Sequence, residues 1–230
     1  MSANYLYFDI ETTAHERISE FAEYQLPDLD SISAPSTYKD PEKIETYEVG
    51  ARRKALLDAK EDYQKQIAKA PLNPDLCQIA AIAWAFGDGP IVSHIVGDLY
   101  DERQVLELFL TGFSENGGVS AGYNILGFDW PVILRRRFDL KMRLPDRARP
   151  NLARYRTYPT LDLMMVLANW NFRDVKSLKW VIKRFGIPND LPDLEGSQVK
   201  DMDPETLKMY VENDVRLTRF LADRMRGIYF

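Results

Sequence analysis

The sequence predicts an α/β protein in which helices cover both faces of a mixed five-stranded sheet. An aromatic strand opens the chain, two strands follow as a hairpin, and helical and strand patterns then alternate. Early strands in hairpin connection followed by this alternation indicate a mixed sheet. At 230 residues, 45% of them hydrophobic, we expect a single domain over 1–230.

The first strand is expected at 5–10, an aromatic-rich stretch whose side chains would alternate between the two faces of a sheet. A polar, proline-punctuated stretch follows, and residues 41–69, rich in Ala, Glu, Lys and Arg, predict one helix or two with a break at Gly50. Residues 13–75 are therefore predicted as a mainly helical insertion after the first strand.

The remaining pattern alternates between strands and helices. Further strands are expected at 76–86, 91–96, 119–123 and 158–161. Helices are expected at 101–113, 130–138, 163–170, 176–185 and from about Pro204 onward, with a loop at 189–200.

Composition excludes several protein classes. The longest apolar run, 79–86, is far shorter than the roughly 20 residues that a membrane-spanning helix needs. The first residues lack the basic and apolar regions of a signal peptide. The single cysteine, Cys77, excludes an intramolecular disulfide, and the two histidines have no cysteine cluster beside them, which argues against structural zinc. We expect a cytoplasmic protein with no membrane partner.

The net charge of −5 hides a basic segment. Residues 135–156 carry nine basic and two acidic side chains between acidic neighbours. Tyr155, Tyr158 and Phe138 lie in or beside this segment and could stack on bases, although core packing is the favoured interpretation of each. The segment itself is either a phosphate-binding surface or a solvated loop and helix face. Its basic residues are Arg135, Arg136, Arg137, Lys141, Arg143, Arg147, Arg149, Arg154 and Arg156.

Acidic residues occur at three positions where the pattern predicts burial. Asp9 and Glu11 share one face of the first strand, roughly 7 Å apart. Asp129 precedes a helix, where an N-cap is the favoured role, and Asn124 is a turn residue when taken alone. Asp9 and Glu11 are either an exposed edge or a site that needs a cation.

The third position is in the last helix. Tyr210 and Asp214 are four residues apart and therefore neighbours on one helix face, within an apolar stripe. An aspartate there needs a buried partner or a metal ion. An ion pair with Arg216 or Arg219 is the structural alternative.

Together, the four carboxylates favour one explanation. Hard oxygen ligands suit two divalent cations, Mg²⁺ or Mn²⁺, rather than zinc or copper. Two such ions about 4 Å apart form a site for in-line attack on a phosphodiester.

The sequence resembles the DEDD 3′–5′ exonucleases, which have the ribonuclease H-like fold. Phe8-Asp-Ile-Glu-Thr12 is similar to their first motif, Asn124-x-x-x-Phe-Asp129 to the second and Tyr210-x-x-x-Asp214 to the third. Because Met209 stands where the histidine subfamily has His, the resemblance is to the tyrosine type. It extends over most of 4–12 and 76–225 and is greatest to the proofreading domain of family B DNA polymerases and free-standing predicted exonucleases.

This resemblance implies roles for single residues. Asp9, Glu11 and Asp214 would hold the ion that activates water, and Asp9 would bridge to a second ion, with Asp129 acting largely through ordered waters. Tyr210 would orient the attacking water. Substrate contacts are implied or expected from Thr12, Asn124, Phe128, Arg135, Arg136 and Arg137.

The function expected is metal-dependent 3′–5′ hydrolysis of single-stranded DNA, releasing nucleoside 5′-monophosphates. The alternatives are the same chemistry on RNA and a catalytically silent module that binds nucleic acid or a partner. The insertion departs from the compact members and would serve as a lid, a docking arm for a replication or repair partner, or a solvated hairpin without a role. Asp162 is expected to cap the following helix and at most to support the site.

Overall fold

A computed structural model describes residues 4–143, 149–189, 191, 199 and 201–230 of the chain and confirms the predicted fold class. The sheet has five strands in the order β3-β2-β1-β4-β5. Its antiparallel half joins β3, β2 and β1, and its parallel half joins β1, β4 and β5. The strands are β1 (Leu6–Ala14), β2 (Cys77–Phe86), β3 (Val92–Ile95), β4 (Ser120–Gly122) and β5 (Thr160–Asp162).

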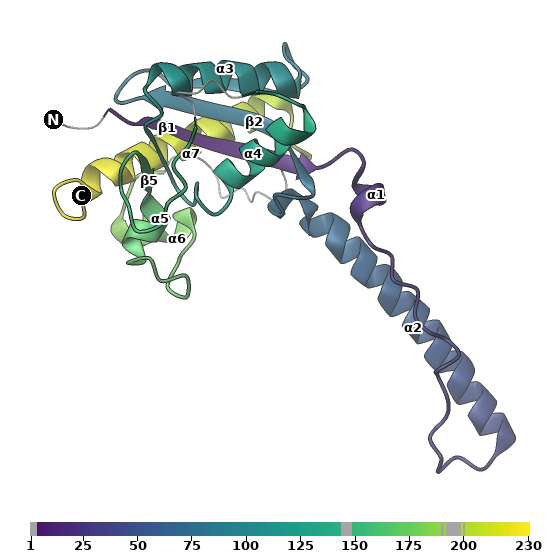
Figure 1. Ribbon diagram of the computed structural model, residues 1–230. Coiled ribbons are helices and arrows are strands. Elements are labelled where there is room, and N and C mark those ends of the chain that lie inside the picture. Colours follow the sequence, from purple (N-terminus) through teal and green to yellow (C-terminus); the bar gives the residue numbers. More distant parts are fainter. Residues whose placement is uncertain (1–3, 144–148, 190, 192–198, 200) are drawn as a thin grey trace.

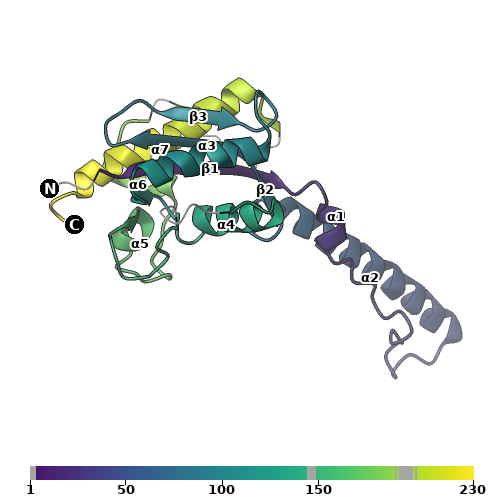
Figure 2. The ribbon, with the colours of Figure 1, turned by 45° about the horizontal axis from the view of Figure 1, so that its top comes forward.

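Helices cover the sheet on both faces (Figures 1 and 2). One core cluster lies between the sheet and α7, α5 and α6, and a second lies between the sheet and α3 and α4. The helices are α1 (Ile18–Phe21), α2 (Pro41–Lys69), η1 (Ala70–Leu72), α3 (Glu102–Glu115), α4 (Asp129–Asp139), α5 (Leu163–Leu167), α6 (Leu178–Phe185) and α7 (Pro204–Met225).

Strand β1 is the centre of the sheet and separates the two cores. Leu6, Phe8 and Ile10 belong to the core under α3 and α4, whereas Tyr5 and Tyr7 belong to the core under α7. This alternation is the period of two that a strand imposes on its side chains. The next side chains on the α7 side are therefore the two acidic residues of the strand.

Several elements differ in extent from their prediction. Strand β1 continues to Ala14, because its pairing with β2 continues to Cys77. Gly50 does not break α2, a single helix of 29 residues, because an internal glycine costs only about 1 kcal/mol. Helix α5 ends at Leu167, shortly before Asn169 and Trp170 adopt positive φ angles. The loop expected at 189–200 lies largely outside the described residues.

The segment between β1 and β2 forms an arm that extends away from the sheet (Figure 1). Helix α2 has no buried residues. The chain leading into α2 returns along it, with the Tyr24 and Tyr63 rings in contact at 5.6 Å between centroids and Gln66 donating to the Glu23 carbonyl. The arm is thus held by its own contacts rather than by the core. That it is an insertion within one domain stays a prediction.

In the part of the chain that the structure describes, every helix is too short or too polar to cross a membrane.

We predict that the arm contributes little to the stability of the sheet. Replacing residues 24–65 with a short Gly-Ser linker should change the free energy of unfolding by less than about 1 kcal/mol, because loop length has a small effect on closure entropy. Gln66 donates a hydrogen bond to the Glu23 carbonyl, so the two chain ends left by the deletion lie close enough for a short linker to join them. Urea denaturation followed by circular dichroism measures the change, and loss of a cooperative transition would contradict the prediction.

Candidate active site

Three carboxylates from two elements meet on the α7 side of the sheet. Asp9 and Glu11 come from β1 and Asp214 comes from α7, and one oxygen atom of each lies within 4.8 Å of the others. All three side chains are partly buried. We call Asp9, Glu11 and Asp214 the carboxylate cluster. Its all-oxygen donor set matches what Mg²⁺ and Mn²⁺ require.

Helix α7 brings Asp214 to β1 by packing an apolar stripe on the sheet. The helix begins after Asp203, whose carboxylate accepts the N–H groups of Glu205 and Thr206. Val211 and Val215, on either side of Asp214, are completely buried. Tyr210 lies one turn before Asp214 on the same face and is half-buried.

The structure does not pair Asp214 with the arginines considered from the sequence. Arg216 donates to Asn213 Oδ1 at 2.7 Å, and Arg219 donates to the Gly89 carbonyl at 2.8 Å. Both guanidinium groups are therefore engaged elsewhere, and the arrangement favours the metal explanation of Asp214.

Asp129 does not cap α4, so that prediction was wrong. The N-cap is Phe128, and Asp129 is the first residue of the helix. Its Oδ1 instead accepts the N–H of Ile10, at 3.2 Å. This N–H is available because β4 pairs with β1 only at Leu6 and Tyr7, which leaves the edge of β1 open beyond them. Asp129, only 3% exposed, is thereby joined to the strand that carries Asp9 and Glu11.

The carboxylates share an environment that favours protonation. Burial raises the pKa of Asp129 to about 8 and that of Asp214 to about 7. Burial, followed by the charges of Asp129, Asp214 and Glu11, raises the pKa of Asp9 well above its usual range. Burial and the charges of Asp214 and Asp129 do the same for the pKa of Glu11. The four side chains therefore act as one electrostatic unit, which bound cations would relieve.

The loop before α4 is built for close packing. Asn124 has a φ of 64°, and its carbonyl accepts the N–H groups of Gly127 and Phe128. A Cβ atom at Gly122 would lie 2.2 Å from Ile125, and one at Gly127 would lie 2.4 Å from Asn124 Oδ1. A larger residue at either position would force these side chains to move, so both glycines allow the tight packing of the loop that precedes Asp129.

Asp162 holds this loop in addition to capping α5. It is completely buried and accepts N–H groups from Asn124, at 3.1 Å, from Leu126, at 2.9 Å, and from Met165, at 3.2 Å. The bond to Met165 confirms the predicted cap. The bonds to Asn124 and Leu126 were not predicted from the sequence, because no local pattern relates Asp162 to residues that lie 38 and 36 positions away.

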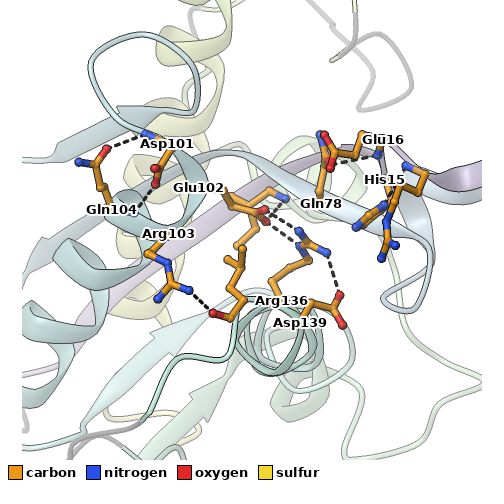
Figure 3. Close-up of polar contacts among 12 residues, drawn as sticks. His15, Glu16, Gln78, Asp101, Glu102, Arg103, Gln104, Arg136 and Asp139 are labelled. Carbon is orange, nitrogen blue, oxygen red and sulfur yellow. Dashed lines mark hydrogen bonds and ion pairs between the residues drawn. The ribbon is translucent and has the colours of Figure 1, made fainter.

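Arg136 and Arg137 occupy the interior rather than a substrate surface, which corrects their expected role. Arg136 makes two bonds to Glu102, at 2.8 and 2.7 Å, and one to Asp139, at 2.8 Å (Figure 3). Arg137 is also buried and donates to the Met142 carbonyl. Glu102 in turn accepts the N–H of Ile79, so this network ties α3 and α4 to β2.

Other predicted substrate residues lie near the acids or on the surface. The Thr12 hydroxyl donates to the Pro71 carbonyl at 2.6 Å, and Phe128 packs against the core under α4. Arg135 is half exposed and pairs with Asp75. Arg147 lies outside the described residues.

The three aromatic residues expected in the core are exposed instead. Phe138 is 85% exposed, Tyr155 73% and Tyr158 59%. The general tendency of aromatic residues toward burial does not hold here, because Phe138 follows the buried Arg137 on the solvent side of α4 and the other two residues lie in a loop.

The chain is similar to a family of predicted exonucleases and to a family B DNA polymerase. Residues 72–226 match the model of DNA_pol_B_exo2, described as a predicted 3′–5′ exonuclease related to the exonuclease domain of PolB. Among solved structures, a family B DNA polymerase from the hyperthermophilic archaeon Pyrobaculum calidifontis is 21% identical, with a TM-score of 0.60. The similarity covers 98% of this chain and 25% of the polymerase, and it shows a ribonuclease H-like fold. Curated proteins provide no match.

We predict that the stability of the metal-free protein falls as pH rises from about 5 to about 8. A carboxyl whose pKa is raised on folding binds more protons in the folded than in the unfolded state. Rising pH therefore lowers the free energy of unfolding, and the fall ends when Asp129 has ionised near pH 8. Thermal melts in EDTA should show this fall, and Mn²⁺ or Mg²⁺ should raise the melting temperature most at the alkaline end, because ligands must lose protons to bind metal.

Asp129→Asn is the matched control for this pH dependence. The amide oxygen can still accept the Ile10 N–H, but the side chain no longer ionises. The pH dependence in EDTA should therefore become shallower, and an unchanged slope would show that Asp129 is not its source.

We predict opposite outcomes for two adjacent arginines. Arg136→Leu should lower the free energy of unfolding by about 3–5 kcal/mol, because it leaves the largely covered carboxylate of Glu102, 12% exposed, without its cation. Arg135→Leu removes an exposed ion pair with Asp75 and an exposed hydrogen bond to the Pro131 carbonyl, and should cost no more than about 1 kcal/mol. Chemical denaturation of both variants measures the difference. Equal losses in the free energy of unfolding would contradict the structural role assigned to Arg136.

Proposed function

Because the chain belongs to the family of predicted 3′–5′ exonucleases related to the PolB exonuclease domain, we propose that it hydrolyses single-stranded DNA from the 3′ end. The products would be nucleoside 5′-monophosphates, released one at a time. A cytoplasmic location stays a prediction from the sequence.

The observation that carries this proposal is the meeting of Asp9, Glu11 and Asp214 within 4.8 Å, with Asp129 bonded to the same strand. Four carboxylates repel one another unless cations are present, and a purely structural role would not require that repulsion. The arrangement also keeps Tyr210 one helical turn from Asp214. These features weigh against the silent binding module.

Each side chain has a proposed task. Asp9, Glu11 and Asp214 would hold one divalent cation, and Asp9 would also hold a second, on which Asp129 would act largely through ordered waters. Bound Mg²⁺ or Mn²⁺ supplies Lewis-acid activation of the phosphodiester and lowers the pKa of water. Tyr210 would orient the attacking water by hydrogen bonding, a positioning role that needs no ionisation of its phenol.

The 3′-terminal nucleotide would lie against the loop before α4. Asn124 and Phe128 belong to that loop, and the Thr12 backbone follows Glu11 on β1. The strand register shifts between Glu11 and Thr12, and such irregularities occur next to active sites. We propose these three residues as the contacts that orient the terminal sugar and base.

The arm would dock a partner of this exonuclease. Helix α2 presents Tyr47, Val49 and Leu57 to solvent at 40%, 58% and 57% exposure. Apolar side chains on an element with no buried residues are available for a protein partner such as a replication or repair component.

A degradation assay tests the function. Single-stranded DNA and RNA oligomers of one sequence, labelled at the 5′ end, are incubated with Mn²⁺, Mg²⁺ or EDTA and separated on a denaturing gel. A metal-dependent ladder that shortens from the 3′ end is expected, with DNA degraded faster than RNA. Faster degradation of RNA would reassign the substrate, and intact bands from folded protein in every lane would reject the enzyme.

Substitutions on α7 should separate ligation from positioning. Asp214→Asn should lower kcat by about 10³-fold, since metal ions contribute several kcal/mol of transition-state stabilisation. Tyr210→Phe should lower it by roughly 10- to 100-fold. Asp223→Asn, on the same helix but exposed and paired with Arg226, is the control and should retain full activity. Wild-type rates from Asp214→Asn would show that the carboxylate cluster is not the active site.

A further inference from the structure

Two loops outside the carboxylate cluster bring aromatic and arginine side chains together. The rings of Tyr155 and Trp170 lie 5.4 Å apart between centroids. The Arg154 guanidinium lies 4.8 Å above the centre of the Phe172 ring. We call Arg154, Tyr155, Trp170 and Phe172 the aromatic–arginine patch.

The patch is open to solvent and positively charged. Tyr155 is 73% and Phe172 52% exposed. Residues 149–173 contain four arginines and a single acidic residue, the fully buried Asp162, in a chain whose net charge is −5. Within the described residues, no ion pair joins Arg154 or Arg156 to a carboxylate. The positive charge is therefore available to a ligand.

The patch has a fixed base. Trp170 packs against the core under α7. The two loops are tied down by buried tyrosines, because Tyr123 donates to the Lys176 carbonyl at 2.6 Å and Tyr5 donates to the Thr157 carbonyl at 3.0 Å. A fixed base limits the entropy that the exposed rings lose when a ligand binds.

We propose that the aromatic–arginine patch binds single-stranded nucleic acid upstream of the 3′ end that occupies the active site. Bases would stack on Tyr155 and Phe172, while Arg154 and Arg156 contact phosphates. Exposed rings interleaved with cations are the combination that single strands require, since every base has a stacking face and every linkage carries a negative charge. The proposal rests on the proposed function for the position of the 3′ end.

The position of the patch makes it sensitive to substrate length. Asp162, which holds the loop before α4, stands at the start of α5, and the patch lies beyond the other end of this five-residue helix. Helix α5 is about 7.5 Å long at a rise of about 1.5 Å per residue. A strand whose 3′-terminal nucleotide lies against the loop before α4, as proposed above, would therefore pass α5 before it reaches the patch, and very short oligomers would not do so.

Binding measured in EDTA, which prevents cleavage, tests the patch. Fluorescence anisotropy with labelled single-stranded DNA and RNA longer than about 16 nucleotides compares the wild type with Tyr155→Ala and Phe172→Ala. Each ring removed should raise Kd roughly tenfold. The double change Arg154→Ala with Arg156→Ala should reduce the slope of log K against log salt by about 0.7 for each lost phosphate contact.

Phe220→Ala is the matched control, because Phe220 on α7 lies outside the patch and is 50% exposed, close to the 52% of Phe172. This variant should bind as the wild type does.

With Mn²⁺, the patch variants should cleave oligomers shorter than about 4 nucleotides at the wild-type rate and longer ones more slowly. Unchanged Kd values in folded patch variants, or an equal loss of affinity in Phe220→Ala, would contradict the proposed binding patch.

The same experiment separates this proposal from the exonuclease itself. Binding that depends on Tyr155 and Phe172, with no cleavage by the wild type in any metal, would support the patch and reject the exonuclease. Cleavage by the wild type with unchanged binding in the variants would retain the exonuclease and reject the patch.

Discussion

Repulsion among buried carboxylates is the physical constraint on which the rest of the structure depends. Burial and mutual charge raise the pKa values of Asp9, Glu11, Asp129 and Asp214. Without cations, ionisation of this group opposes folding, so the surrounding structure must hold the side chains together. Cations relieve the repulsion when they bind, and the same carboxylates that destabilise the metal-free protein then provide its ligands. Stability and the proposed activity are thus coupled through one group of side chains.

Two networks of hydrogen bonds hold α4 and the loop before it, and thereby position Asp129. The bonds of Arg136 to Glu102, and of Glu102 to the Ile79 N–H, fix α4 against α3 and β2 (Figure 3). Asp162 fixes the loop before α4 through the N–H groups of Asn124 and Leu126. Neither network belongs to the carboxylate cluster, yet both determine where Asp129 lies. Small displacements in such supports have large effects on catalysis, because reactive groups must be placed within fractions of an ångström.

Charge is divided between the active site and the surface around it. The carboxylate cluster is partly buried and acidic, which suits metal ions, whereas the exposed loop that carries Arg154 and Arg156 is basic, which suits phosphates. The arm between β1 and β2 adds a third surface that carries exposed apolar side chains on a helix without buried residues. Metal, polyanion and a protein partner can therefore each be proposed for a different part of the chain.

The sequence by itself determined the fold class and the composition of the carboxylate cluster. Strand alternation placed Asp9 and Glu11 on one face, and helical spacing placed Tyr210 beside Asp214, because both relations are local. Only the tertiary structure decided the roles of residues whose partners are distant. Asp129 bonds to Ile10 rather than capping its own helix, and Arg136 pairs with Glu102 rather than facing substrate. A basic or acidic residue has the same local signature whether it is buried with a partner or exposed to a ligand, and the difference arises only when the elements pack.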